Sequence, residues 1–122
     1  MIAWLNFNDI MFGTTIETNR EELISKYSSA PPPAERVDGI RWVKEQGFKT
    51  FITIEPIMDF DVDELSAMIR TANPNWINIG ADSKGHNLPE PSGEKILALI
   101  ENIRQSGIEI RNKSNLKRLL DN

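Results

Sequence analysis

The sequence predicts an α/β domain built on a parallel sheet, and three observations lead to this prediction. Apolar segments of strand type alternate with segments of helical periodicity along the chain. Their connections are short, which favours parallel pairing through right-handed crossovers. The 122 residues, 39% hydrophobic and 26% charged, suffice for one domain with one core. We therefore expect a single domain over residues 1–122, with four consecutive βα units that form half of a TIM-like barrel or a small parallel sheet.

The N-terminal part is expected to supply a lead-in, one strand and a connection. Residues 1–10 are apolar with interleaved polar residues, and this lead-in fits a short helix and an extended segment equally well. Residues 11–18 are rich in threonine and isoleucine, which predicts the first strand. A helical turn is expected around residues 21–26. Residues 30–33 are expected to be extended and loop-like because three consecutive prolines lack backbone donors.

Residues 49–60 combine a predicted buried strand with a charged C-terminal end. Residues 51–54 form an unbroken β-branched and aromatic run, which is typical of a strand buried on both faces. Pro56 has no backbone donor, so the strand should end near Glu55 and leave this carboxylate at its C-terminal end. A helix is expected over residues 34–47 ahead of this strand, because apolar residues recur there at helical spacing and a glycine closes the segment.

The C-terminal half repeats the alternation of helix and strand. Strands are expected at residues 76–80 and 108–113. Helices are expected around residues 65–69, ending before Pro74, from the N-cap candidate Ser92 to the closing Gly107, and over residues 116–120. Ser92 is an N-cap candidate, although Lys95 stands where a capping box needs an acid.

Composition excludes several kinds of chemistry. The net charge of −4 and the pI near 5.0 give no electrostatic reason to expect nucleic acid as a direct partner. No apolar run approaches the roughly 20 residues that span a bilayer, and no secretion signal is evident, so we expect a cytoplasmic location. The chain has no cysteine, so these residues cannot hold disulfides, zinc–thiolate sites or cysteine-bound iron–sulfur clusters.

Every predicted strand ends beside a charged side chain. These strand ends carry Glu17 with Asn19, Glu55, Asp82 with Ser83, and Lys113. Parallel neighbours bring their carboxyl ends to one edge, where such groups serve acid–base chemistry, a divalent cation, or hydrogen bonds to ribose hydroxyls and an amino group. The structural alternative at each position is a helix cap or an ion pair with lysine. A small hydrolase using Glu17 and Glu55 is another alternative.

Other conspicuous residues are expected to have structural roles. His86 has no second histidine or cysteine beside it and is interpreted as a solvated loop residue. The pair of residues 117–118, lysine and arginine, complements the C-terminal end of the last helix. The three tryptophans, Trp4, Trp42 and Trp76, lie in or beside apolar patterns and are expected in the core.

The order of several motifs resembles the later part of radical S-adenosylmethionine proteins, in particular a phage-associated branch. The motifs are GTTIETN (13–19), APPPAER (30–36), TIEPIMDFD (53–61), NIGADS (78–83), LPEP (88–91) and RNKSNL (111–116). The resemblance implies a partial α/β barrel in which S-adenosylmethionine lies across the strand ends and a [4Fe-4S] cluster, held by CxxxCxxC, cleaves it reductively. It further implies that five residues face cofactor or substrate: Glu17, Asn19, Glu55, Asp82 and Lys113.

The chain departs from that family where the chemistry begins, because it lacks all cysteines. The resemblance therefore implies a C-terminal barrel half that is inactive alone, with the cluster-binding half upstream of Met1 or on another chain. The alternative is a non-catalytic scaffold or binding module. A half barrel exposes two strand edges and an inner face, so we expect a homo-oligomer or a separate N-terminal half as partner.

Overall fold

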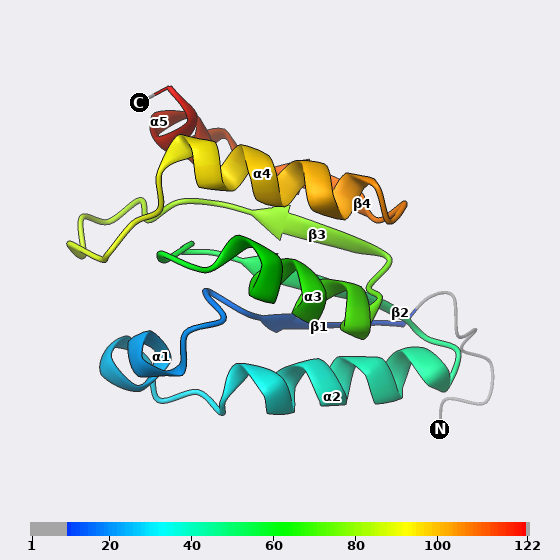
Figure 1. Cartoon of the computed structure of the whole chain (residues 1–122). Coiled ribbons are helices and arrows are strands. Elements are labelled where there is room, and N and C mark those ends of the chain that lie inside the picture. The colour runs from blue at the N-terminus through cyan, green and yellow to red at the C-terminus, as the bar shows by residue number, and fades with distance from the viewer. Residues whose placement is uncertain (1–9, 122) are drawn as a thin grey trace.

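The computed structural model describes residues 10–121 and confirms the α/β class. One four-stranded sheet has the order β1-β2-β3-β4, and every neighbouring pair is parallel (Figure 1). The strands are β1 (Met11–Thr15), β2 (Lys49–Ile54), β3 (Trp76–Ile79) and β4 (Glu109–Asn112). The first is shorter than expected, so Glu17 and Asn19 follow the strand instead of ending it. The expected lead-in lies outside the described residues except for Ile10.

The helices alternate with these strands as predicted. They are α1 (Glu21–Tyr27), α2 (Pro33–Glu45), α3 (Val62–Ala72), α4 (Gly93–Arg104) and α5 (Lys117–Leu120), with a 3-10 turn η2 (Ser114–Leu116). Ser92 caps α4 as expected, since its Oγ accepts the amide of Lys95 at 3.2 Å. Pro33 was expected in an extended segment but opens α2, because the fixed φ of proline suits the first helical turn.

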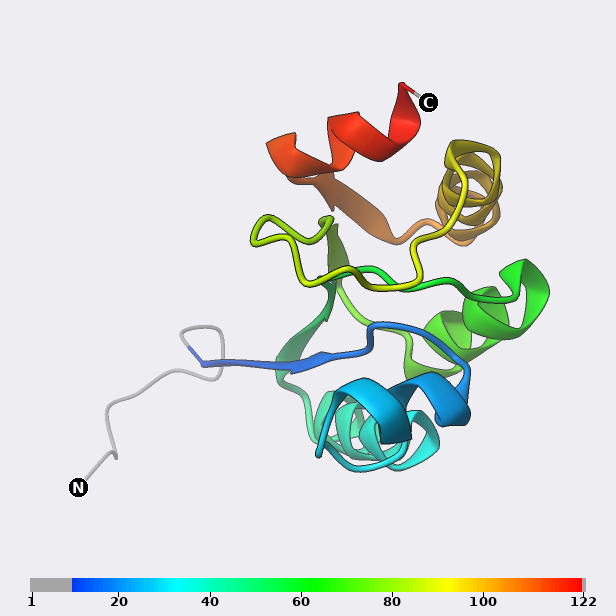
Figure 2. The ribbon, with the colours of Figure 1, turned by 90° about the vertical axis from the view of Figure 1, so that its left-hand side faces the viewer.

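The sheet is covered by helices on one face only. Each strand is added beside the preceding one, so crossovers of one hand place α2, α3 and α4 together on the same side (Figure 2). The register shows the result: Ile52 and Ile54 are fully buried, whereas Phe51 and Thr53 are half-buried. The expectation that this strand is buried on both faces is therefore wrong. The uncovered side is called the open face below.

The hydrophobic core lies between the sheet and α2, α3 and α4. Its largest fully buried side chains are Phe60, Ile16, Ile52, Ile54, Ile57, Leu65, Ile69, Ile77, Ile79, Ile96, Leu99 and Ile103. Alternate residues of β2 and β3 supply the sheet side, and the apolar stripes of α3 and α4 supply the other. The core thus fixes the strand ends that carry the candidate site.

The tryptophans do not form this core. Trp42 is 63% exposed, because it lies on the side of α2 opposite the buried Val37 and Ile40. Trp76 is half-buried on the open face, where its ring stacks on Phe51 at 4.9 Å. Trp4 lies outside the described residues. The core expectation is therefore wrong for Trp42, and Trp76 packs at the open face.

Candidate functional site

The centre of the candidate site is the carboxylate of Glu55, directly after β2. Its Oε1 accepts Lys113 Nζ at 2.5 Å, and its Oε2 accepts Asn115 Nδ2 at 3.0 Å. Burial would raise the pKa of Glu55, but the bonds from Lys113 and Asn115 outweigh it and hold this pKa below its ordinary value. Two of the predicted site residues, Glu55 and Lys113, thus form an ion pair across the end of β3.

Asn115 completes this arrangement and was not among the predicted site residues. Its Oδ1 accepts the amide of Ala81 at 3.0 Å, and its Nδ2 donates to the carbonyl of Ala81 at 2.9 Å as well as to Glu55. The side chain therefore ties the start of η2 to the segment after β3. A neutral amide gives no charge signal, which is why the sequence did not indicate Asn115 as a site residue.

Asp82 follows β3 and organises the loop over residues 82–91. Its Oδ1 accepts the amide of Lys84 at 3.1 Å and lies 2.8 Å from Nδ1 of His86, while its Oδ2 accepts the amide of His86 at 2.6 Å. The hydrogen bond from the His86 ring is the main reason that the pKa of Asp82 is lowered to about 2. His86 is 59% exposed, as expected of a loop residue, yet it is bound to Asp82.

Glu55 and Asp82 line the same cavity at the carboxyl ends of adjacent strands. The cavity measures about 340 Å³ and is lined by Glu55, Pro56, Ala81, Asp82, Ser83, Lys84 and His86. Both carboxylates are ionised at neutral pH because their pKa values are lowered. The cavity therefore offers carboxylate acceptors to a ligand with hydroxyl or amino donors, and Lys84 and His86 line it beside them.

A larger cavity of about 660 Å³ shares Asp82 and Ser83 with this one. Asp82, Ser83 and Asn115 line it together with Glu90 and Arg118. Arg118 binds both carboxylate oxygens of Glu90, at 2.9 and 2.6 Å, and the carbonyl of Asp82 at 3.1 Å. Residues 117–118 were expected only to complement a helix end. Arg118 instead fastens the loop to α5.

Glu17 lies in a separate cavity. Its Oε2 is 3.4 Å from Nη1 of Arg36, and the two side chains are only 13% and 8% exposed. Arg36 also donates to the carbonyls of Thr15 and Pro31. Glu17 lines a cavity of about 130 Å³ that shares Pro56, but not Glu55, with the cavity described above. The structure therefore does not place Glu17 and Glu55 in one cavity.

Asn19 has a structural role that the sequence did not indicate. Its Nδ2 donates to Asp61 Oδ2 at 3.1 Å, and its Oδ1 accepts the amide of Asp61 at 2.8 Å. Arg20 binds both Asp61 oxygens and Asp59, and Lys95 also binds Asp59. These bonds join the loop after β1 to the start of α3. Asn19 is therefore engaged by Asp61 and not by Glu55, Asp82 or Lys113.

In comparisons with known proteins, no family model, curated protein or solved structure matches the chain. Within residues 10–121, no group of three or more acidic or histidine side chains is placed to hold a metal ion. No helix in the described part of the chain is long and apolar enough to cross a membrane.

Proposed function

We propose that this chain is the C-terminal half of a partial α/β barrel of the radical S-adenosylmethionine type, and that it contributes cofactor- or substrate-facing strand ends. The observation that carries the proposal is the cavity shared by Glu55 and Asp82 at the ends of adjacent parallel strands. Barrel enzymes place their chemistry at this end of the sheet. The unidirectional strand order and the one-sided helices also suit a barrel wall.

The residues present fit S-adenosylmethionine but not its iron–sulfur cluster. S-adenosylmethionine carries a sulfonium cation, an amino group and ribose hydroxyls, and the ionised Glu55 and Asp82 are acceptors for such groups. When bound, it supplies radical chemistry to enzymes of this type. A cluster held by thiolates does not fit a chain without cysteine, so no step through a cluster is assigned to these residues.

The open face exposes aromatic side chains that another polypeptide could cover. It presents the stacked rings of Phe51 and Trp76, with the guanidinium of Arg111 4.3 Å from the centre of the Trp76 ring. Strands β1 and β4 form the two edges of the described sheet. We propose that a separate N-terminal half, which would bring the cluster cysteines, pairs with these edges and covers the open face.

Calorimetric titration of the full chain with S-adenosylmethionine tests the cofactor assignment. Binding is expected, and Glu55→Gln and Asp82→Asn should each weaken it by about tenfold, because each removes a charged acceptor. Glu101→Gln is the matched control, since Glu101 pairs with only Arg104 and Gln105 among residues 10–121, on the exposed side of α4. The folded wild-type chain giving no heat at millimolar ligand would overturn the assignment.

A non-catalytic scaffold is the second candidate, and one observation favours it. Glu17, Glu55 and Asp82 each already have a cationic, amide or histidine partner within the described residues. A scaffold needs such pairs only for stability. It therefore predicts that Lys113→Met lowers the melting temperature while no variant changes any ligand titration.

A further inference from the structure

The cavity of about 130 Å³ beside Glu17, called the Glu17 cavity below, has a mainly apolar lining and one carboxylate. Its walls come from the loops after β1, β2 and β3 and from the end of α1, and they consist of Glu17, Tyr27, Ser28, Pro56, Met58 and Leu88. Ligand pockets combine such an apolar lining with a few placed polar groups. An apolar cavity of about 150 Å³ holds benzene, so this one takes one group of roughly that size.

Backbone hydrogen bonds hold the walls of the Glu17 cavity together. The amide of Met58 donates to the carbonyl of Glu17 at 3.0 Å, which joins the loops after β1 and β2. The amide of Asp59 donates to the carbonyl of Pro89 at 2.6 Å, which joins the loops after β2 and β3. The Oγ1 of Thr18 also donates to the carbonyl of Asp59, at 2.6 Å. The cavity is therefore formed before a ligand enters, and binding does not carry the cost of ordering these loops.

One carboxylate oxygen of Glu17 remains available to a ligand. Oε2 contacts Nη1 of Arg36 at 3.4 Å, whereas Oε1 accepts no hydrogen bond from another residue within 10–121. In this part of the chain, the buried side-chain atoms without a partner are Arg36 Nη2 and Thr50 Oγ1, so Glu17 Oε1 retains accessible surface. The Glu17 side chain is only 13% exposed and lines the cavity, which is therefore the route by which a ligand reaches Oε1.

The charges around the Glu17 cavity favour a neutral ligand. The guanidinium of Arg36 offsets the charge of Glu17, and the ammonium of Lys26 lies 5.4 Å from the centre of the Tyr27 ring. These two cations oppose a cationic ligand. Glu17, which unlike Arg36 lines the cavity, opposes an anionic one. A neutral hydroxyl or amide N–H instead forms a charge-assisted hydrogen bond with the carboxylate.

We propose that the Glu17 cavity binds a small apolar ring or chain that ends in a hydroxyl or amide N–H, and that this group donates to Glu17 Oε1. Tyr27, Met58 and Leu88 pack against the apolar part of the ligand. The site goes beyond the proposed cofactor function, because Glu55 and Asp82 line a different cavity. Its test therefore succeeds or fails independently of the titration with S-adenosylmethionine.

Titrations of the full chain, followed by the NMR chemical shifts of its backbone amides, test this site. The probes are benzyl alcohol, benzyl methyl ether, benzylamine and benzoate, which share one ring and differ in donor and charge. Benzyl alcohol should bind with a roughly millimolar dissociation constant and shift the amides of the residues that line the cavity. The other three should bind about tenfold more weakly, because the ether lacks the donor and the other two carry a charge. Equal affinity for all four probes, shifts confined to other parts of the chain, or no binding of benzyl alcohol at tens of millimolar would overturn the proposal.

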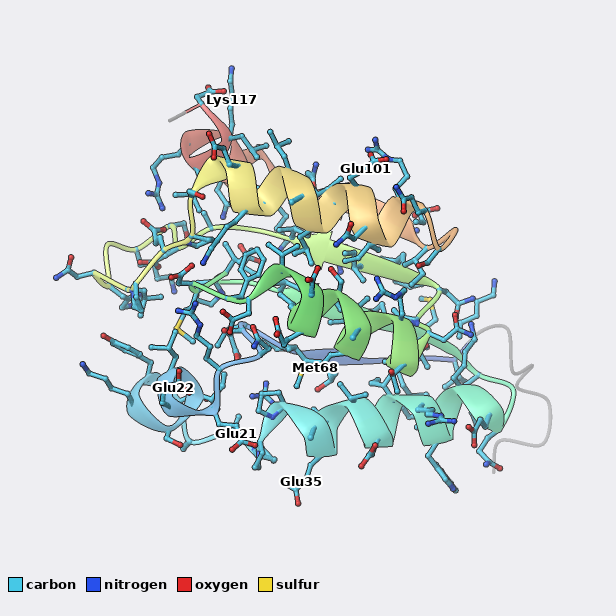
Figure 3. The ribbon with its side chains drawn as sticks, viewed as in Figure 1. Glu21, Glu22, Glu35, Met68, Glu101 and Lys117 are labelled. Carbon is cyan, nitrogen blue, oxygen red and sulfur yellow. The ribbon has the colours of Figure 1, made fainter. Side chains whose placement is uncertain are left out.

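Two variants separate the apolar wall from the carboxylate. Tyr27→Ala removes a wall residue that is 40% exposed, so the fold should persist while benzyl alcohol binds about tenfold more weakly. Glu17→Gln leaves the charge of Arg36 without compensation, so benzoate should bind this variant more tightly than benzyl alcohol does. Glu22→Gln is the matched control, because Glu22 is exposed on α1 (Figure 3) and does not line the cavity. An affinity for benzyl alcohol that Tyr27→Ala leaves unchanged would overturn the proposal, whether or not Glu17→Gln folds.

Discussion

Gly80 makes room for the carboxylate of Glu55. A Cβ on Gly80 would stand 2.7 Å from Cδ and Oε2 of Glu55, closer than such atoms approach in proteins, and 3.1 Å from Oδ1 of Asn115, which is a tight contact. The bare backbone at the end of β3 lets Glu55 cross from β2 and reach Lys113 beyond β4. The ion pair at the centre of the candidate site therefore depends on a residue without a functional group.

Gly80→Ala should separate Glu55 from Lys113. The added methyl group displaces the end of the Glu55 side chain, which is flexible, so the expected loss of unfolding free energy is about 1–2 kcal/mol. Urea denaturation measures this loss. Lys113→Met should cost less in the Gly80→Ala background than in the wild type, because the pair is already broken. Equal costs in both backgrounds would show that Gly80 does not position Glu55.

Protonation of Asp61 should lower the stability of the folded chain in acid. The hydrogen bond from Arg20 is the main reason that the pKa of Asp61 is lowered from 3.8 to about 2 in the folded chain. As the pH falls, Asp61 is therefore protonated in the unfolded chain before it is protonated in the folded chain. The stabilisation from Asp61 is present above pH 4 and is lost as the pH falls towards 2. Thermal melts at several pH values should show this loss.

Two variants test whether the contact between Arg20 and Asp61 causes this acid sensitivity. Asp61→Asn should make the dependence of melting temperature on pH between 4 and 2 less steep, because one titrating group is gone, while Asp82, whose pKa is also lowered to about 2, keeps part of the slope. Arg20→Met should also flatten it, since the guanidinium holds the pKa of Asp61 low. A profile that stays as steep in both variants would place the acid sensitivity in another group.

Much of the fold is predictable from local patterns, because strands and helices alternate with clear signals. The proline that follows Glu55 predicts its place at a strand end, and the predicted strand over residues 76–80 predicts that of Asp82. Both lie where expected because parallel strands share one carboxyl edge.

The remaining features depend on which faces meet, and local patterns do not carry that information. An apolar run such as residues 51–54 looks the same with helices on one face or two, so the half-burial of Phe51 was missed. Trp42 has the apolar character of a core residue, but its position around α2 turns it outward. The bonds of Asn19 with Asp61 join segments 42 residues apart, which no spacing rule identifies.

Adjacent residues of β2 should differ sharply in their contribution to stability. Ile52 is fully buried under the helices, so Ile52→Ala should lower the unfolding free energy by about 2–5 kcal/mol. Thr53 faces the open side and accepts one hydrogen bond, from Asn78 at 3.2 Å, so Thr53→Ala should cost about 1 kcal/mol or less. Chemical denaturation compares the two. Similar costs would mean that the open face is covered in solution.

The bidentate contact of Arg118 with Glu90 should control the mobility of the loop over residues 82–91. Arg118→Lys keeps the charge but cannot bind both carboxylate oxygens, so limited proteolysis should cut this loop faster than in the wild type. Global stability should change little, because Arg118 is half exposed and such pairs contribute about 1 kcal/mol or less. Arg104→Lys is the matched control, since Arg104 contacts Glu101 within α4 at 3.9 Å. Equal cleavage of both variants and the wild type would show that the bidentate contact of Arg118 does not control the mobility of this loop.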